Sequence, residues 1–222
     1  MLLAIDTSTR VIGVALYDGK QVLSEAIWAS QDYHTVELAP EIAELLGRVR
    51  ISVSDLEAIA VALGPGSFTG LRIGLALAKG MALARHLALV GIPSLDVIAA
   101  AQPVRDLPLA AVLRAGRGRL AVGWYKSEKG NWKSKGNLEV LTAEALADRL
   151  KEPTLVCGEL TDEDRHLLTR KRGIALIASP ARSLRRPSYL AELAWRRWQA
   201  GRVDDPTTLV PYYLHFSEPN PG

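Results

Sequence analysis

The chain has 222 residues, enough for one large or two small domains with a real core. Its 48% hydrophobic content excludes a disordered chain, and a single cysteine, Cys157, excludes an internal disulfide and favours a reducing compartment. Asp6 ends the first apolar run too early for a signal peptide, and no apolar run reaches the ~18 residues of a membrane span. We therefore expect a cytoplasmic globular protein with no membrane association.

Charge is divided unevenly along the chain. Residues 1–100 hold 7 basic and 10 acidic residues, a net charge of −3, whereas residues 101–222 hold 20 and 14, a net charge of +6. Between Arg165 and Arg202, ten basic residues stand against one acid, Glu192. Such a run could contact nucleic-acid phosphates, but without an aromatic ladder it is more typical of a solvated helix face.

The first half of the chain predicts a strand hairpin, a helix and a buried strand. Asp18-Gly19 is a strong hairpin signal, and Ser52 to Asp55 has the spacing of a capping box. Pro40 lies inside a helical pattern, so that helix either begins near Leu38 or kinks. The predicted elements are strands over 2–6, 12–17 and 21–26, a helix over 35–46, a helical turn over 52–55 and a strand over 58–63.

The segment from Gly64 to Gly74 is the most informative stretch of the chain. Its glycines and proline predict a tight turn between a strand and a helix over 71–85, with Ser67 or Thr69 as the helix cap. Free N–H groups at a helix start suit an anion, so one interpretation is a phosphate loop.

The composition of the helix over 71–85 supports a different interpretation. It is apolar almost all round, so one face can cover a sheet while another packs on a second helix or on a partner. Gly70, Gly74 and Ala78 recur every four residues and would let a neighbouring helix approach closely. A wholly internal core helix fits the same pattern.

The second half repeats the hairpin-then-helix order after Pro103 to Pro108, which we interpret as a lobe boundary. Its predicted elements are strands over 109–113, 120–125, 138–141, 154–157 and 174–178, with helices over 142–150, 162–170 and 188–200. The tail from Val203 is predicted to be irregular. Two such lobes, 1–102 and 103–222, predict a duplicated α/β fold with a ligand site between them, and helix 188–200 could pack back on the first lobe.

Three stretches together resemble the bacterial TsaB (YeaZ) family of the actin-like ATPase (ASKHA, ribonuclease H-like) superfamily. They are Ile5 to Thr9, His34 to Pro40 and Gly64 to Gly74, and Pro211-Tyr212-Tyr213-Leu214 resembles the family's C-terminal motif. The resemblance implies two lobes with mixed sheets flanked by helices. It also implies a non-catalytic dimerisation and activating subunit, not an enzyme, of the complex that makes threonylcarbamoyladenosine (t6A) beside the tRNA anticodon.

The resemblance further implies the partners and cofactors of this chain. The partners would be a catalytic TsaD-like paralogue, a TsaE-like ATPase and, when the chain is alone, a second copy of itself, with tRNA reached through the complex. No cofactor would be required, although ATP and magnesium could contact Asp6, Thr7, Ser8 and Thr9, as carboxylates at this position do in the superfamily. From the two-faced helix we expect the partner interface at Leu38, Ile42, Leu45, Phe68, Gly70, Leu71, Gly74, Leu75 and Ala78.

Catalytic motifs are weak in this sequence. The catalytic paralogues carry His-x-x-x-His on a helix, but the residue four after His34 is Leu38, and His86, His166 and His215 have no ligand spacing, so we expect no metal site. Ser67 is misplaced for a Gly-x-Ser-x-Gly elbow, and Cys157 is typical of a buried strand.

Two further points remain open from the sequence. The second-lobe hairpin departs from the family pattern at Arg114, Arg119 and Ala121, which reverses the charge expected at the mouth between the lobes. The main alternative function is a stand-alone ATP-binding or ATP-hydrolysing enzyme of the actin-like superfamily. A peptidase and a direct tRNA-binding module are further alternatives.

Overall fold

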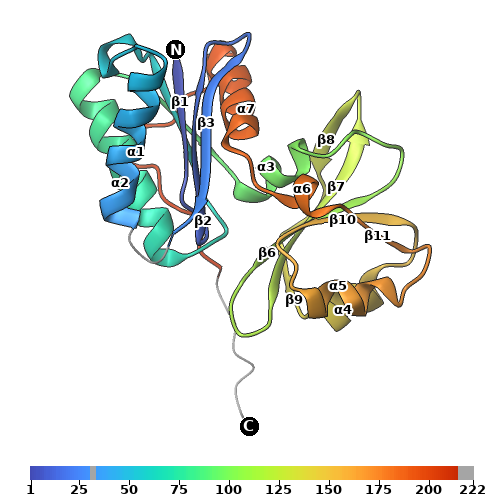
Figure 1. Ribbon diagram of the computed structural model, residues 1–222. Helices are drawn as coiled ribbons and strands as arrows, with labels where there is room; N and C mark the ends of the chain where they lie inside the picture. The colour runs from blue at the N-terminus through green and yellow to red at the C-terminus, as the bar shows by residue number, and fades with distance from the viewer. Residues whose placement is uncertain (31–33, 215–222) are drawn as a thin grey trace.

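The computed structural model describes residues 1–30 and 34–214, which form two lobes, each with a mixed sheet flanked by helices (Figure 1). This arrangement confirms the predicted duplicated actin-like fold. No helix within these residues is long and apolar enough to cross a membrane.

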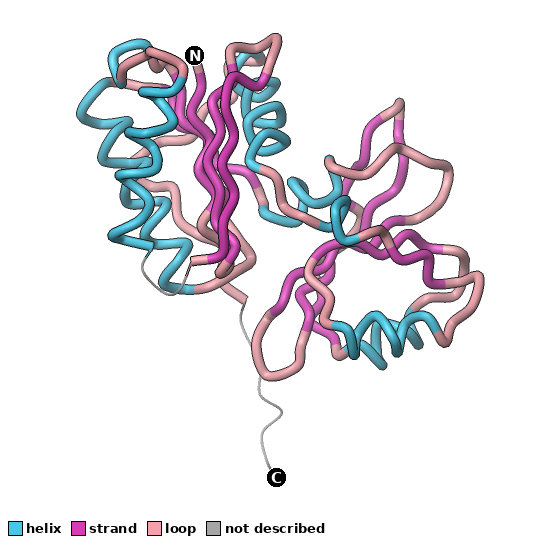
Figure 2. Tube along the Cα trace, in the orientation of Figure 1, coloured by secondary structure: helices cyan, strands magenta, loops and turns pink. Residues whose placement is uncertain are grey.

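The first sheet has the strand order β3-β2-β1-β4-β5. Its strands are β1 (Leu2–Asp6), β2 (Val11–Tyr17), β3 (Val22–Ala29), β4 (Ala58–Ala62) and β5 (Ala88–Ile92). The hairpin strands β1, β2 and β3 pair antiparallel, whereas β4 lies parallel to β1 and β5 parallel to β4. The central strands β1 and β4 are buried along their whole length, because helices cover both faces of the sheet (Figure 2).

Helices α1 (His34–Arg48) and α2 (Phe68–Arg85) cover one face of the first sheet, and α7 (Pro187–Gln199) covers the other. Helix α1 begins at His34 and continues through Pro40, so the predicted start near Leu38 is wrong. A 3-10 turn (Val53–Asp55) carries the predicted capping box at Ser52. Helix α2 begins three residues earlier than expected because the Ser67 hydroxyl accepts a hydrogen bond from Gly70 N at 3.3 Å.

The second sheet has the order β11-β10-β6-β7-β8, with β9 also paired to β7. Its strands are β6 (Leu109–Arg114), β7 (Leu120–Glu128), β8 (Asn131–Ser134), β9 (Glu139–Leu141), β10 (Thr154–Gly158) and β11 (Ala175–Ile177). Helices α4 (Ala143–Arg149) and α5 (Asp162–Thr169) cover one face, and α3 (Ser94–Ala100) covers the other. The short helix α6 (Pro180–Ser183) contacts β10.

The two lobes exchange helices. Helix α3 comes before residue 102 in the sequence, yet its Leu95, Ile98 and Ala99 lie in the core of the second lobe. Helix α7 comes from the second half and buries Leu190, Ala191 and Ala194 against the first sheet. The chain therefore crosses between the lobes more than once, and one crossing passes through Arg185, two residues before α7.

Candidate functional site

The turn before α2 packs on the loop that follows β1. Ser67 N donates to Ser8 O at 2.6 Å, and a Cβ on Gly66 would lie only 2.1 Å from the same oxygen. This position therefore requires glycine because two backbone segments touch there. Since the Ser67 N–H is used within the chain, the turn acts as a contact between two loops of the first lobe, which weakens its interpretation as a phosphate loop.

Two glycines of α2 face the interior of their own lobe. A Cβ on Gly70 would lie 2.3 Å from Thr7 O, and one on Gly74 would lie 2.2 Å from Thr7 Oγ1. Thr7 Oγ1 in turn donates to Gly70 O at 2.7 Å. The close approach that these glycines allow is therefore to the loop after β1 of the same chain, not to a partner helix.

Most of the expected interface residues have the same location. Eight of the nine are buried in the first lobe, where they cover the sheet: Leu38, Ile42, Leu45, Gly70, Leu71, Gly74, Leu75 and Ala78. The expectation that they contact a partner is thus corrected to a role in the core. Phe68 is 54% exposed, and its ring lies under the Arg72 guanidinium and beside the Tyr213 ring.

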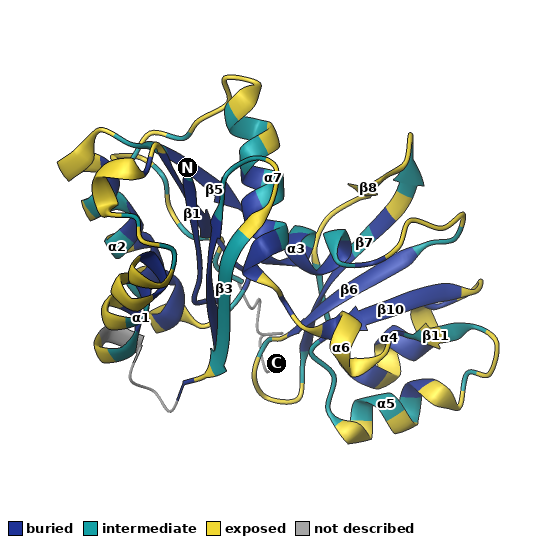
Figure 3. Ribbon diagram, turned by 45° about the horizontal axis from the view of Figure 1, so that its top comes forward, coloured by how far each residue is buried: buried dark blue, intermediate teal, exposed yellow. Residues whose placement is uncertain are grey.

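A different row of residues makes up the outward surface of these two helices. We call it the outer face of α1 and α2, and it consists of exposed small or apolar residues: Val36, Ala39, Ala43, Ala76, Gly80 and Leu83. Val36 is 66% exposed and Leu83 57% exposed. Figure 3 shows exposed residues along the outside of both helices, whereas the strands behind them are buried. The second apolar face predicted for α2 therefore exists, on other residues than those expected.

The loop after β1 is engaged by the protein itself. Asp6, Thr7 and Ser8 are all buried. Asp6 Oδ1 accepts from Ser8 N at 2.9 Å, and its Oδ2 accepts from Arg185 Nε at 2.6 Å. The Ser8 hydroxyl lies 2.6 Å from the hydroxyl of Ser94 on α3. The carboxylate and both of these hydroxyls thus serve contacts within the chain.

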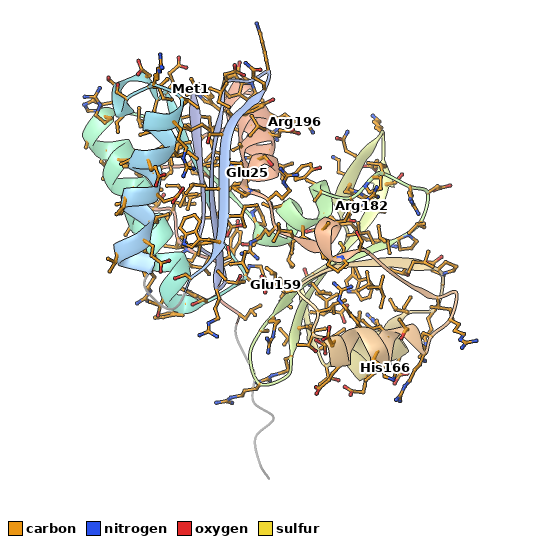
Figure 4. The ribbon with its side chains drawn as sticks, viewed as in Figure 1. Met1, Glu25, Glu159, His166, Arg182 and Arg196 are labelled. Atoms are coloured by element: carbon orange, nitrogen blue, oxygen red, sulfur yellow. The ribbon has the colours of Figure 1, made fainter. Side chains whose placement is uncertain are left out.

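Arg185 connects this loop to the second lobe. Besides Asp6, its guanidinium donates to Glu159 Oε1 at 2.8 Å, to Thr9 Oγ1 at 3.0 Å and to Val11 O at 2.7 Å. Burial disfavours the charge of Arg185, but Asp6 and Glu159 outweigh this effect and raise the pKa of the guanidinium above its usual value. Figure 4 places Glu159 between the lobes. No sequence pattern singles out Arg185, because it stands in a basic run typical of a solvated face.

The possible nucleotide contact at Asp6 to Thr9 does not fit this geometry. A magnesium-nucleotide would need a carboxylate that faces the cleft, whereas Asp6 is 1% exposed and already paired with a cation of the chain. No three His, Cys, Asp or Glu side chains within the described residues form a metal-binding group. His86 and His166 are exposed, on α2's end and on α5, and His215 lies outside the described residues.

A cleft of about 1220 Å³ lies beside this network, between the lobes. Its lining comes from the loop after β1, the start of α2, the β6–β7 hairpin and the tail, and includes Thr9, Phe68, Arg114, Glu159 and Tyr213. Arg114 thus brings positive charge to the cleft, as expected. Ala121, in contrast, is fully buried in the core of the second lobe and does not line the cleft.

We expect Cys157 to resist thiol reagents in the folded protein. It is buried on β10, and this burial raises the pKa of its thiol to about 12. Because the thiolate is the reactive form, alkylation at pH 8 should be slower than in the urea-unfolded chain by on the order of a thousandfold. Equal rates in the folded and unfolded protein would contradict the buried position. The thiol is accordingly a core group and no nucleophile.

Two lobes with mixed sheets, exchanged helices and an aspartate at the end of the first strand define a protein with the duplicated actin-like fold. The ROK hexokinase from Thermus thermophilus shares this fold, with a TM-score of 0.51 at 12% identity over 89% of this chain and 99% of that chain. At this identity the likeness concerns the fold alone.

Sequence comparisons then identify the family within this fold class. The family model for TsaD, tRNA N6-adenosine threonylcarbamoyltransferase, matches residues 21–154. The tRNA threonylcarbamoyladenosine biosynthesis protein TsaB of Bacillus subtilis (strain 168) is 33% identical over 222 residues, which cover 98% of this chain and 95% of that protein. YeaZ from Pseudomonas aeruginosa superposes with a TM-score of 0.80 at 26% identity, over 96% of this chain and 99% of that one. The chain belongs to the TsaB (YeaZ) family.

Proposed function

We propose that this chain is a non-catalytic dimerisation and activating subunit in the biosynthesis of tRNA threonylcarbamoyladenosine. Its main partner is a TsaD-like catalytic paralogue, joined by a TsaE-like ATPase, and tRNA is reached through that complex in the cytoplasm. The similarity to the tRNA threonylcarbamoyladenosine biosynthesis protein TsaB of Bacillus subtilis supports this pathway. The observation that carries the role of the subunit is the outer face of α1 and α2, which presents apolar and small side chains to solvent.

This face suits a partner built on the same fold. Val36, Ala39 and Ala43 follow one another along α1, and Ala76, Gly80 and Leu83 do so along α2, at spacings of three and four residues. A paralogue with the same two helices could pack against them as a four-helix arrangement, with small residues at the contact. A second copy of this chain would occupy the face when the paralogue is absent.

The subunit needs no cofactor of its own in this proposal. The stand-alone ATP-hydrolysing alternative requires a free carboxylate in the cleft, whereas Asp6 is buried and paired with Arg185. The environment of Asp6 therefore argues against that alternative.

We expect Leu83→Glu to weaken association with the TsaD-like paralogue at least about tenfold. The substitution places a charge within the proposed apolar contact, where a buried unpaired carboxylate is costly. Leu176→Glu is the matched control, because Leu176 is 37% exposed on β11 of the other lobe. Affinity is measured by biolayer interferometry and the complex by size-exclusion chromatography. Equal affinities for wild type and Leu83→Glu would refute the proposed interface.

A further inference from the structure

Four oxygen-bearing groups converge on one buried point between the lobes. They are the carboxylates of Asp6 and Glu159, the hydroxyl of Thr9 and the carbonyl of Val11. Asp6, Thr9 and Val11 belong to the first lobe, whereas Glu159 follows β10 of the second. Carboxylate, hydroxyl and carbonyl oxygens are the donors that a hard cation prefers. The site is therefore built to hold a positive charge.

The chain supplies that charge itself. The Arg185 side chain is 2% exposed, and its Nε, Nη1 and Nη2 each donate to at least one of these oxygens. A planar guanidinium has five N–H groups in a fixed fork, so it can satisfy acceptors on several sides at once, as a lysine cannot. The pairing also joins the lobes, because one guanidinium holds a carboxylate from each.

We propose that Arg185 is an internal cation that occupies the position a metal-nucleotide would need at Asp6, and that it thereby holds the two lobes together and keeps the cleft closed to magnesium-nucleotides. The proposal rests on the non-catalytic role proposed above and gives it a physical basis. An external cation could reach Asp6 only if Arg185 left, and its departure would break a buried ion pair.

Removal of the side chain should create a site for a free guanidinium ion. In Arg185→Ala, millimolar guanidinium chloride should raise the thermal midpoint by about 2 to 4 °C relative to the same concentration of sodium chloride. The matched control is Arg186→Ala, whose side chain is 50% exposed and pairs with Glu25 inside the first lobe. Wild type and Arg186→Ala should show no such rise. The proposal is overturned if Arg185→Ala responds to guanidinium as Arg186→Ala does.

Calorimetry tests the closed cleft directly. Wild type titrated with millimolar magnesium-ATP should give no binding heat. Binding by wild type that is lost in Asp6→Asn would overturn the proposal, because it would show that Asp6 is available to the nucleotide.

If Arg185→Ala fails to fold, the contact between the lobes can be tested with Glu159→Gln instead. This variant weakens only the second-lobe side of the network, since Asp6 still pairs with Arg185. Small-angle X-ray scattering should then show a larger radius of gyration for Glu159→Gln than for wild type. An unchanged radius of gyration would contradict the proposal that Arg185 holds the two lobes together. These readouts do not involve the outer face of α1 and α2. A negative result for the Arg185 contact between the lobes can therefore be told apart from a negative result for partner binding.

Discussion

Gly70→Ala should lower the free energy of unfolding by about 2 kcal/mol or more, although alanine is the better helix former. The added Cβ would lie 2.3 Å from the carbonyl oxygen of Thr7, which belongs to the backbone of a central, fully buried segment and cannot move aside cheaply. Overpacking of this kind costs about 1 to 3 kcal/mol, sometimes more, and exceeds the helix-propensity gain of roughly 1 kcal/mol. Urea denaturation monitored by circular dichroism measures the change.

The same helix offers a matched control. Gly80 also lies inside α2, but a Cβ there would meet nothing within 4 Å. Gly80→Ala should therefore raise the free energy of unfolding by about 0.5 to 1 kcal/mol. If both substitutions stabilised the protein equally, the close contact between α2 and the loop after β1 would be disproved.

These two glycines also mark the limit of the sequence prediction for the first lobe. Most strands and helices were predictable because their signals are local: the Asp18-Gly19 turn, the Ser67 cap and the apolar run of β2. Periodicity assigns residues to a face of α2, but it does not say what covers that face. The partner of Gly70 is Thr7, 63 residues earlier, so the choice between core and interface depended on the tertiary fold.

Three elements were absent from the sequence prediction, and in each case the local sequence lacks the pattern that would indicate it. Strand β5 (Ala88–Ile92) follows α2 after only two residues and is apolar, so it reads as a continuation of the helix. Helix α3 (Ser94–Ala100) is buried on almost every side, which removes the polar face that marks an amphipathic helix. Strand β8 (Asn131–Ser134) is short and mostly exposed, and thus lacks an alternating pattern.

The central residue of the site had no sequence signal at all. Arg185 is one of ten basic residues between Arg165 and Arg202. Its neighbour Arg186 is half exposed and forms an ordinary ion pair with Glu25. What separates the two is the position of Asp6 and Glu159, which come from β1 and from the end of β10. Charge patterns along a sequence cannot locate a buried cation whose partners lie on two other segments.

Asp6→Asn should lower the free energy of unfolding by about 3 kcal/mol, because Asp6 is part of the buried network around Arg185. Each carboxylate oxygen of Asp6 accepts one N–H, from Ser8 N and from Arg185 Nε. An amide has only one acceptor oxygen, so in either orientation one donor would face another donor in the interior. Removal of one partner from a buried ion pair costs about 3 to 5 kcal/mol, and the remaining bond of Arg185 to Glu159 favours the lower value.

Glu44→Gln is the control for loss of a carboxylate, because Glu44 forms an exposed pair with Arg48 on α1. Its effect should stay within about 0.5 kcal/mol. A double-mutant cycle of Asp6→Asn and Glu159→Gln then tests the link between the lobes. The two carboxylates share Arg185, so we expect their effects to depart from additivity by at least about 0.5 kcal/mol. Additive effects would mean that each carboxylate acts within its own lobe, and that Arg185 does not couple the stability of one lobe to that of the other.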